Sequence, residues 1–566
     1  MTGAENDEIA TMLEEFADRL EAKGVEYKPR AYRNAAESVR EASPAELDAP
    51  KTIPDVGDAI ASKIDEYRET GRVEEIQELR DEMPVDIEAL TRVEGVGPKT
   101  VGKLYDALGV TDLDELEDAA RKGRVRNVKG FGEKTEQNIL DGVEFARQSA
   151  ERTPLGESLP RARELVARVE DAPGVVRAVA TGSVRRRKET TGDIDIVVVS
   201  DDREATADAV TDWEVEVVQK GDRKTSFRRD GEDVDLHLVE EEEFGAALQY
   251  FTGSKKHNVK TRDVAIDLGL KLNEYGVWKE EDGEDERVAG EDEEEVYAAL
   301  GMAYPPPELR EDRGEVEAAL EDSLPELVEV DDVRGELHSH TERTDGGATL
   351  EEMVAGAQER GMEYLAVTDH TEALGVAGGL TDEELLELAE DIRELDDESE
   401  IRVFTGAEAN ILKDGTIDVS DKVLSELDIV VASVHSAFGM ERDEATERLV
   451  SAVRHDEVDI IGHPSGRLIN SREGYDYDFE ELLKAAEEEG VALELNANPR
   501  RLDVRDTQVR RCVEAGVPVA VNTDAHVPSE YDYVEYGVAT ARRGWAESRD
   551  VLNTRTAEEL EDWLGL

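Results

Sequence analysis

Cysteine is almost absent from this chain. Its 566 residues include one cysteine, Cys512, which excludes an intramolecular disulfide and a cysteine-rich zinc site. Long apolar runs are also missing: none reaches the roughly 18 residues of a membrane helix, and the N-terminus lacks the basic and apolar segments of a secretory signal. We therefore expect a soluble, cytoplasmic protein with no membrane partner.

Basic and aromatic residues are scarce as well. The chain has 139 acidic and 67 basic residues, a formal net charge of -72, and 5% aromatic residues. Apolar runs recur throughout, which excludes a disordered acidic protein. A charge of this size repels itself in dilute buffer, and near-molar salt screens it with a Debye length of about 3 Å. The composition therefore predicts adaptation to high salt, as in a halophile.

The stretch from Gly182 to Asp195 combines a Gly-Ser turn, a cluster of cations and two aspartates. Asp193 and Asp195 begin a predicted strand, and because residues i and i+2 of a strand share a face, their carboxylates point the same way. A third carboxylate, Asp235, is expected on a neighbouring strand. Carboxylates on one face can hold two divalent cations, which stabilise both oxygens of an in-line phosphoryl displacement. One such aspartate is usually a solvated strand end, but the full arrangement favours a metal site.

This pattern resembles the nucleotidyltransferase superfamily and, more closely, the palm of family X DNA polymerases, the DNA polymerase beta group. The resemblance implies that Asp193, Asp195 and Asp235 hold two ions, Mg²⁺ or Mn²⁺, and that Asp235 helps to activate the primer 3′-hydroxyl. It also implies nucleotide contacts at Gly182, Ser183, Arg186, Gly192, Tyr250, Phe251, Gly253, Asn258 and Arg262. Two residues depart from the family pattern. Arg187 replaces a small residue, and His237 stands where an arginine is common, so we expect an effect on rate without loss of a metal ligand.

Three related phrases near the N-terminus each lead into a predicted helix. They begin at Ile53, Val93 and Val128 and read apolar-x-Gly-apolar-Gly, except that Asp55 replaces the first glycine of the first copy. This is the helix-hairpin-helix signature, whose turn directs backbone N–H groups at a DNA phosphate without sequence preference. A single copy is often a simple turn between helices, but three copies favour DNA binding. The expected contacts are Val56, Gly57, Gly95, Gly97, Gly130 and Gly132.

The N-terminal region also resembles the small DNA-binding domain of family X polymerases. In some members this domain is a lyase that forms a lysine Schiff base with an abasic sugar, and Lys63 falls at the position of that nucleophile. A neighbouring basic position of the family is Ala59 here. The alternative is that Lys63 only contacts phosphate or solvent.

From residue 333 onward, predicted strands alternate with helices, and short apolar runs end in histidine or carboxylate. In a barrel of such units, the carboxyl ends of the strands meet at one face and carry the active site. A single histidine there is usually structural, but most of the nine histidines of the chain gather at these ends. Imidazole and carboxylate together suit Zn²⁺, Mn²⁺ or Fe²⁺ more than Mg²⁺. The expected metal ligands are His338, His340, Asp345, His370, Glu408, His435, His463, Asp524 and His526.

This set is too large for one tetrahedral ion, so a cluster bridged by carboxylates is expected. The pattern resembles the PHP (polymerase and histidinol phosphatase) domain, and this resemblance implies that Glu408 bridges the ions. It further implies an active metal-dependent phosphoesterase, acting as a 3′-5′ exonuclease or as an abasic-site endonuclease.

The two resemblances cover nearly the whole chain, in the order found in bacterial and archaeal family X polymerases. We expect a multidomain α+β and α/β fold with helical helix-hairpin-helix domains, a nucleotidyltransferase palm and a distorted β/α (TIM-like, PHP) barrel. The expected parts are a lyase-like DNA-binding domain (1–85), a helix-hairpin-helix subdomain (86–152), the palm (153–241), a nucleotide-selecting subdomain (242–304), a linker (305–332) and the PHP domain (333–566).

The expected function is gap filling in DNA repair, including base excision repair, by a monomer that acts on gapped or primer-template DNA and dNTPs. One alternative is a small-molecule phosphatase of the histidinol-phosphate type fused to an inactive nucleotidyltransferase. The other is a non-catalytic scaffold for DNA ends. The intact aspartate set and the hairpin repeats disfavour the first, and the complete ligand sets disfavour the second.

Overall fold

The computed structural model describes residues 2–566 except 26–27, 43–46, 48, 94, 151, 230, 282–283 and 376. The chain forms two compact units. One comprises Met1–Glu151 with Asn470–Glu473, and the other comprises Arg152–Ile469 with Gly474–Leu566. Among the described residues, no helix has both the length and the apolar character needed to cross a bilayer.

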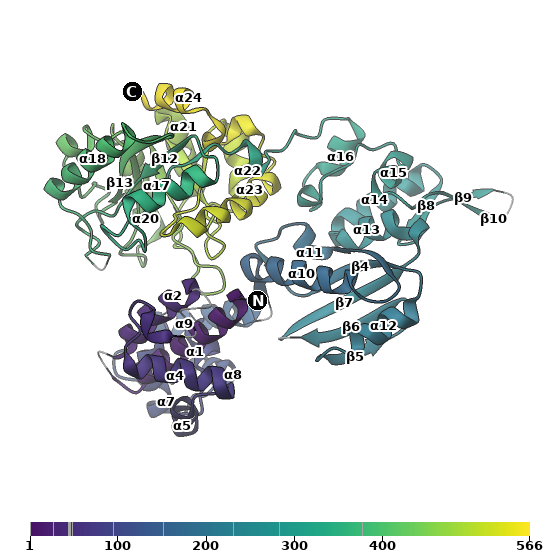
Figure 1. Ribbon diagram of the computed structural model, residues 1–566, viewed down its shortest axis with the longest axis horizontal. Coiled ribbons are helices and arrows are strands. Elements are labelled where there is room, and N and C mark those ends of the chain that lie inside the picture. The colour runs from purple at the N-terminus through teal and green to yellow at the C-terminus, as the bar shows by residue number, and fades with distance from the viewer. Residues whose placement is uncertain are drawn as a thin grey trace. The chain divides into compact units, whose positions relative to one another are not determined.

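The N-terminal unit is helical (Figure 1). One apolar cluster gathers residues such as Leu13, Phe16 and Ile64, and a second gathers Val96, Val101 and Ile139. The predicted turns each precede a helix, namely α4, α7 and α9. The helices of this unit are α1 (Thr2–Ala22), α2 (Lys28–Glu41), α4 (Asp58–Thr70), α5 (Glu74–Glu82), α6 (Ile87–Thr91), α7 (Pro98–Leu108), α8 (Leu113–Arg121) and α9 (Glu133–Ala150).

A five-stranded sheet forms the first part of the second unit, in the order β2-β4-β7-β6-β5. Its central strands β4 and β7 are parallel, and their register places Asp195 opposite Asp235. Both faces of β4 are buried, because Ile196 and Val198 pack in one apolar cluster while Val197 and Val199 pack in another. The strands are β2 (Val175–Ala180), β4 (Ile194–Ser200), β5 (Glu216–Lys220), β6 (Lys224–Arg229) and β7 (Glu232–Val239), with α10 (Leu155–Glu170), α11 (Gly182–Arg185) and α12 (Arg203–Thr211) beside them.

The next segment adds helices and a three-stranded antiparallel sheet of order β10-β9-β8. Within the expected linker, Arg310 is fully buried and its guanidinium pairs with Glu293, so this stretch is packed against its neighbours. The elements are α13 (Phe244–Thr252), α14 (Lys255–Asp267), β8 (Leu270–Asn273), β9 (Gly276–Glu281), β10 (Glu284–Ala289), α15 (Glu293–Ala299) and α16 (Glu315–Leu320).

The C-terminal part is a seven-stranded parallel sheet whose strands follow one another in chain order. A bridge between Ser339 and Ala525 joins its first and last edges, so the sheet curls into a nearly closed barrel. This confirms the expected TIM-like fold. The strands are β11 (Gly335–Glu336), β12 (Tyr364–Val367), β13 (Arg402–Asn410), β14 (Ile429–Ser433), β15 (Ile460–Gly462), β16 (Ala492–Asn496) and β17 (Val519–Asn522).

Side chains of the barrel strands alternate between two cores, as the pleat requires. Ala366, Val431 and Ile460 join an inner cluster that includes Leu560 of the C-terminal helix α24 (Ala557–Leu564). Leu365 and its counterparts on other strands belong to a second cluster, which they form with residues of the outer helices. Figure 1 shows these helices around the strands. These helices are α17 (Leu350–Glu359), α18 (Asp382–Asp396), α20 (Arg442–Val453), α21 (Phe479–Glu489), α22 (Asp506–Ala515) and α23 (Val534–Arg543). The strand interiors are thus apolar, and polar groups are left for the strand ends.

The close approach of β11 to β12 gives a stability prediction. A Cβ added at Gly335 would lie 2.5 Å from the carbonyl oxygen of Tyr364, and the Tyr364 ring is held by a 3.0 Å hydrogen bond to the Asn553 carbonyl. Gly335→Ala should therefore lower the free energy of unfolding of the barrel by about 1–3 kcal/mol, as overpacking does. Denaturant unfolding would measure it. Gly439→Ala is the control, since its Cβ would meet nothing within 4 Å, and equal midpoints for the two variants would contradict the expectation.

Two candidate metal-dependent sites

Three carboxylates meet at one end of the β4–β7 pair. Asp193 directly precedes β4, Asp195 lies on it, and Asp235 lies opposite on β7. Burial and the carboxylates of Asp195 and Asp235 raise the pKa of Asp193. Burial also acts to raise the pKa of Asp235, but hydrogen bonds from Lys224 and Ser226 outweigh it and lower that pKa. Crowded like charges of this kind favour a bound cation.

His237 reaches the same carboxylates. Its Nε2 lies 3.1 Å from Asp195 Oδ1, and its ring stacks on Phe251 with centroids 3.6 Å apart. Ligand atoms of Asp195, Asp235 and His237 all lie within 4.8 Å of one another. The histidine that departs from the family pattern therefore still contacts a palm aspartate. Its effect on rate stays a prediction.

A cavity of about 810 Å³ opens beside the aspartates. Its lining is rich in cations, although the chain as a whole is strongly acidic. Every residue predicted to contact the nucleotide lines it, together with four that the expected set did not include. Those four are Arg152, Lys188, Lys255 and Val259.

The turn at Gly182 packs directly against the side chain of Asp195. Gly182 has a φ of +62°, and an added Cβ would lie 2.6 Å from Asp195 Oδ2. Both the backbone conformation and the space therefore require glycine here. Gly253 also has a positive φ, +68°, and a Cβ there would lie 3.2 Å from Arg186 Nη1.

Asn258 lines the cavity, but its amide is engaged within the protein. Its Nδ2 donates to the Tyr250 carbonyl at 2.6 Å, and its Oδ1 accepts from Gln249 Nε2 at 3.0 Å. In this structure Asn258 therefore fixes the end of α13, which carries Tyr250 and Phe251. Its predicted contact with the base stays a prediction.

Arg152 is a charged cavity residue that sequence reasoning missed. Its Nη2 donates to the Thr190 carbonyl at 2.5 Å and its Nε to Thr190 Oγ1 at 2.8 Å, and Nη1 lies 3.7 Å from where a Cβ on Gly192 would be. The residue belongs to no local motif, so only the fold brings it to the cavity.

The hairpin turns of the N-terminal unit are open to solvent. The equivalent positions Asp55, Gly95 and Gly130 have φ of 58°, 76° and 98°. Gly57 and Gly97 cap α4 and α7 without a side-chain hydrogen bond. A Cβ at any of the five predicted glycines would meet nothing within 4 Å. The Val56 side chain is buried, and its backbone N–H donates to the Ile53 carbonyl oxygen at 3.3 Å, so its contact with DNA stays a prediction.

Lys63 does not lie in open solvent. Its Nζ forms an ion pair with Glu75 and lies 4.7 Å from the centroid of the Phe16 ring, and its side chain is 12% exposed. The lyase role stays a prediction.

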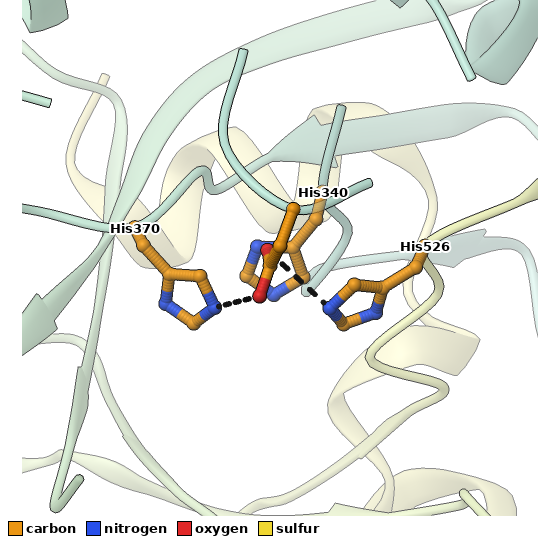
Figure 2. A group of neighbouring side chains, drawn as sticks. His340, His370 and His526 are labelled. Atoms are coloured by element: carbon orange, nitrogen blue, oxygen red, sulfur yellow. Dashed lines mark ion pairs between the residues drawn. The ribbon is translucent and has the colours of Figure 1, made fainter. Parts of the chain in front are cut away.

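The second site lies at the carboxyl ends of the barrel strands, where all the predicted PHP ligands come together. Figure 2 shows the rings of His340, His370 and His526 converging on one space, where Asp345 lies 3.3 Å from His370 Nε2 and 3.5 Å from His526 Nε2. The remaining ligands surround two carboxylates, Glu408 and Asp524. Glu408 Oε1 lies 3.1 Å from His435 Nε2, 3.0 Å from His463 Nε2 and 3.4 Å from His338 Nε2. Asp524 Oδ1 lies 3.0 Å from His340 Nε2.

The donor atoms of this cluster fit a group of cations. Several are buried and form no hydrogen bond of acceptable geometry among the described residues, namely His338 Nε2, His340 Nδ1, His370 Nδ1, His463 Nδ1 and both oxygens of Glu408. The Glu408 oxygens nevertheless lie within ion-pair distance of the surrounding imidazoles. Buried polar atoms without partners are rare and costly. Imidazole nitrogens mixed with carboxylate oxygens suit Zn²⁺, Mn²⁺ or Fe²⁺.

The shifted pKa values of the cluster histidines also indicate a site for cations. Burial, with His370 and His526 nearby, lowers the pKa of His340 to about 3. Burial opposes protonation of His370 too, but Glu408 and Asp345 raise its pKa to about 10. Carboxylates thus attract protons onto imidazoles that a metal would need in the neutral form. Metal binding should therefore release protons.

Two further side chains orient the ligands. Glu494 Oε1 lies 2.7 Å from His338 Nδ1, and its Oε2 accepts from the His463 backbone N–H at 2.6 Å. Asn410 Oδ1 lies 2.8 Å from His435 Nδ1. The two contacts to ring nitrogens leave the Nε2 atoms of His338 and His435 directed at Glu408. Sequence reasoning missed both residues, although a glutamate within the apolar run of β16 was a signal.

The Glu494 contact gives a prediction about metal affinity. Partners that orient metal-bound histidines typically contribute about 10- to 100-fold in affinity. Glu494→Gln keeps the shape but removes the charge, so it should weaken Mn²⁺ binding to chelator-treated protein by about tenfold. Calorimetric titration and metal analysis would measure this. The control is Glu359→Gln, which changes an exposed residue of α17. Equal Mn²⁺ affinities in the two variants would contradict the role of Glu494 in orienting His338.

Four family models match the chain. They are "Helix-hairpin-helix domain" over residues 4–73, "SAM-like Helix-hairpin-helix tandem" over 87–144, "DNA polymerase beta thumb" over 247–311 and "PHP domain" over 336–498.

A curated relative matches nearly from end to end. It is "DNA polymerase/3'-5' exonuclease PolX" of Bacillus subtilis, 38% identical over 98% of this chain and 99% of its own length. Shorter relatives match a third or so of the chain. "Probable phosphatase" of Caldicellulosiruptor saccharolyticus is 34% identical over 34% of this chain and 81% of its own length. "Probable phosphatase Teth514_1060" of Thermoanaerobacter is 28% identical over 38% of this chain and 90% of its own length. With the aspartate site, the hairpins and the barrel cluster in one chain, the full-length match shows that the protein belongs to the family X DNA polymerases that carry a PHP domain.

Proposed function

We propose that the chain is a DNA-directed DNA polymerase that also removes nucleotides from DNA 3′ ends at a separate site in its barrel. The observation that carries this proposal is that both ligand sets are complete in one chain and each is gathered in one place. The full-length Bacillus subtilis relative carries both activities in its name. The relatives named as phosphatases match only about a third of this chain, so they favour no small-molecule activity for the whole protein.

In the polymerase site, Asp193, Asp195 and Asp235 would hold Mg²⁺ or Mn²⁺. Such ions stabilise the attacking and leaving oxygens of an in-line displacement. The carboxylate of Asp235 would take part in activating the primer 3′-hydroxyl. Arg186 and the turn at Ser183, which also line the cavity, would bind the triphosphate. Tyr250 and Phe251 would lie against the sugar of the incoming dNTP.

In the barrel, the histidine and carboxylate cluster would hold Mn²⁺, Zn²⁺ or Fe²⁺, with Glu408 shared between ions. Ions clustered in this way act as Lewis acids on a phosphate ester. The protein's part is to hold the neutral imidazoles in place through Glu494 and Asn410. The substrate would be a DNA 3′ end. An abasic-site endonuclease activity would use the same cluster.

The hairpin turns suit a DNA partner for a very acidic chain. Backbone N–H groups bind phosphate without adding positive side chains, and their contacts carry no sequence preference. We propose a monomer that works on gapped or primer-template DNA in repair, including base excision repair, in the cytoplasm of a halophile. We retain the division into six parts, and the lyase role of Lys63, as proposals.

Paired variants test the two sites separately. Asp193→Ala with Asp195→Ala removes two expected ligands of the polymerase ions, so extension of a labelled primer should be lost while shortening of the same primer continues. His338→Ala with His340→Ala should do the reverse. Gel analysis of primer length in molar KCl with Mn²⁺ would measure both. A folded double variant that loses both activities would show that the two-site proposal is wrong.

The hairpins give a prediction about DNA affinity. Gly95→Val forces a β-branched side chain into a left-handed turn, which should displace the backbone donors and weaken DNA binding by about fivefold, the worth of one hydrogen bond. Fluorescence anisotropy on two unrelated sequences would measure it, and the loss should be the same for both. Gly71→Val is the control, because Gly71 has a similar φ of +70° and equally open space but ends α4. If both variants bind like the parent protein, the hairpin contact is refuted.

A further inference from the structure

Two buried arginines of the barrel contact the segment 186–189, which follows α11 and lines the cavity through Arg186 and Lys188. Arg543, the last residue of α23, donates from Nη1 to the Arg186 carbonyl oxygen at 2.7 Å. Arg467 donates from Nη1 to Glu189 Oε2, also at 2.7 Å. Their side chains are 4% and 3% exposed. This segment is thus attached to the barrel at both of its ends.

Glu311 links the barrel arginine to the cavity arginine. Its Oε1 accepts from Arg186 Nε at 3.0 Å and from Arg543 Nη1 at 3.2 Å. Arg543 Nη2 donates to Asp506 Oδ2 at 2.8 Å. Each group in this chain of contacts is mostly buried. Without Arg543, Glu311 would keep Arg186 as its partner and Asp506 would keep Arg313, but the link from the barrel to Arg186 through Glu311 would be lost.

Apolar side chains also pack between the barrel and the five-stranded sheet. Leu502 and Tyr536 of the barrel belong to the same apolar cluster as Ile196 and Leu236 of the five-stranded sheet. A Cβ on Gly156, at the start of α10, would lie 2.5 Å from Pro499 Cβ. The position of Arg543 relative to Arg186 is therefore fixed by a packed interface, and not by one flexible side chain.

We propose that Arg543 is a positioning residue for the polymerase site, and that the barrel thereby completes the subsite for the triphosphate of a dNTP. Arg543 fixes the backbone of Arg186 directly and its guanidinium through Glu311. The Arg186 guanidinium is then held on the cavity wall before the nucleotide arrives, so less ordering is needed on binding. This inference rests on the proposed polymerase function.

A neighbouring arginine provides a matched control. Arg542 also comes from α23 and forms ion pairs with the mostly buried Glu308 at 2.9 Å and the exposed Glu329 at 2.6 Å. Among the described residues, no hydrogen bond or ion pair joins it to Arg186. Arg542→Ala therefore removes interface ion pairs without releasing the cavity turn. Arg543→Lys keeps a positive charge at the interface but loses the planar fork, and serves as a milder variant that should fold.

The experiment compares Arg543→Ala, Arg543→Lys and Arg542→Ala on the full chain. For Arg543→Ala we expect the KM for dATP on a one-nucleotide gap to rise by about tenfold or more with kcat changed far less, since a charge-assisted contact is lost. Arg543→Lys should fall between this and the parent protein. Arg542→Ala should leave KM unchanged. Shortening of a primer without dNTPs should persist in all three.

Calorimetric binding of dATP to the protein–DNA complex, with Ca²⁺ as the divalent ion, tests the inference without turnover. If the parent protein binds dATP but does not extend a primer, the proposed polymerase function fails while the role of Arg543 is still measured. Equal dissociation constants for Arg543→Ala and Arg542→Ala would overturn the inference. So would equal losses of thermal midpoint and kcat in these two variants with KM unchanged, because that outcome marks a purely structural role.

Discussion

Carboxylates held close together repel one another, and both candidate sites of this protein are built on that repulsion. On the five-stranded sheet, the parallel register of β4 and β7 forces Asp195 and Asp235 to lie opposite each other. In the barrel, the strand ends enclose Glu408 and Asp524 within a ring of histidines. Neither arrangement is stable as a set of bare charges. Lys224, His237 and the buried imidazoles offset part of the cost, and divalent cations would offset the rest.

The same electrostatics explain how so acidic a chain can be suited to nucleic acid. Its formal charge of -72 would repel a phosphate backbone at long range, but salt shortens that range to a few ångströms. At contact distance the protein presents open backbone turns in its N-terminal unit and a cavity lined by Arg152, Arg186, Lys188, Lys255 and Arg262. Positive charge is thus placed inside a cavity, while the surface stays acidic.

Local patterns in the sequence predicted most of the site because the fold is regular where the chemistry lies. The spacing of Asp193 and Asp195 at the start of a strand predicted that they lie together, although Asp193 comes just before β4. The barrel ligands follow short apolar runs that alternate with helical segments, a pattern that favours strands. Contacts between distant segments left no such pattern. Arg152 and Arg543 reach their partners through the packing of distant segments, whereas Glu494 left only the signal of a carboxylate within an apolar strand. Asn258 is the reverse case. Its motif could be recognised in the sequence, but the sequence did not show that its amide binds its neighbours on α13.

One measurement addresses the central claim, that a single chain carries a synthesising and a degrading site. A 5′-labelled primer on a one-nucleotide gap is incubated with the parent protein in molar KCl and Mn²⁺, with and without dNTPs. The account predicts lengthening by one nucleotide when dNTPs are present and shortening when they are absent. A primer unchanged under both conditions, alongside hydrolysis of a generic phosphomonoester, would contradict it.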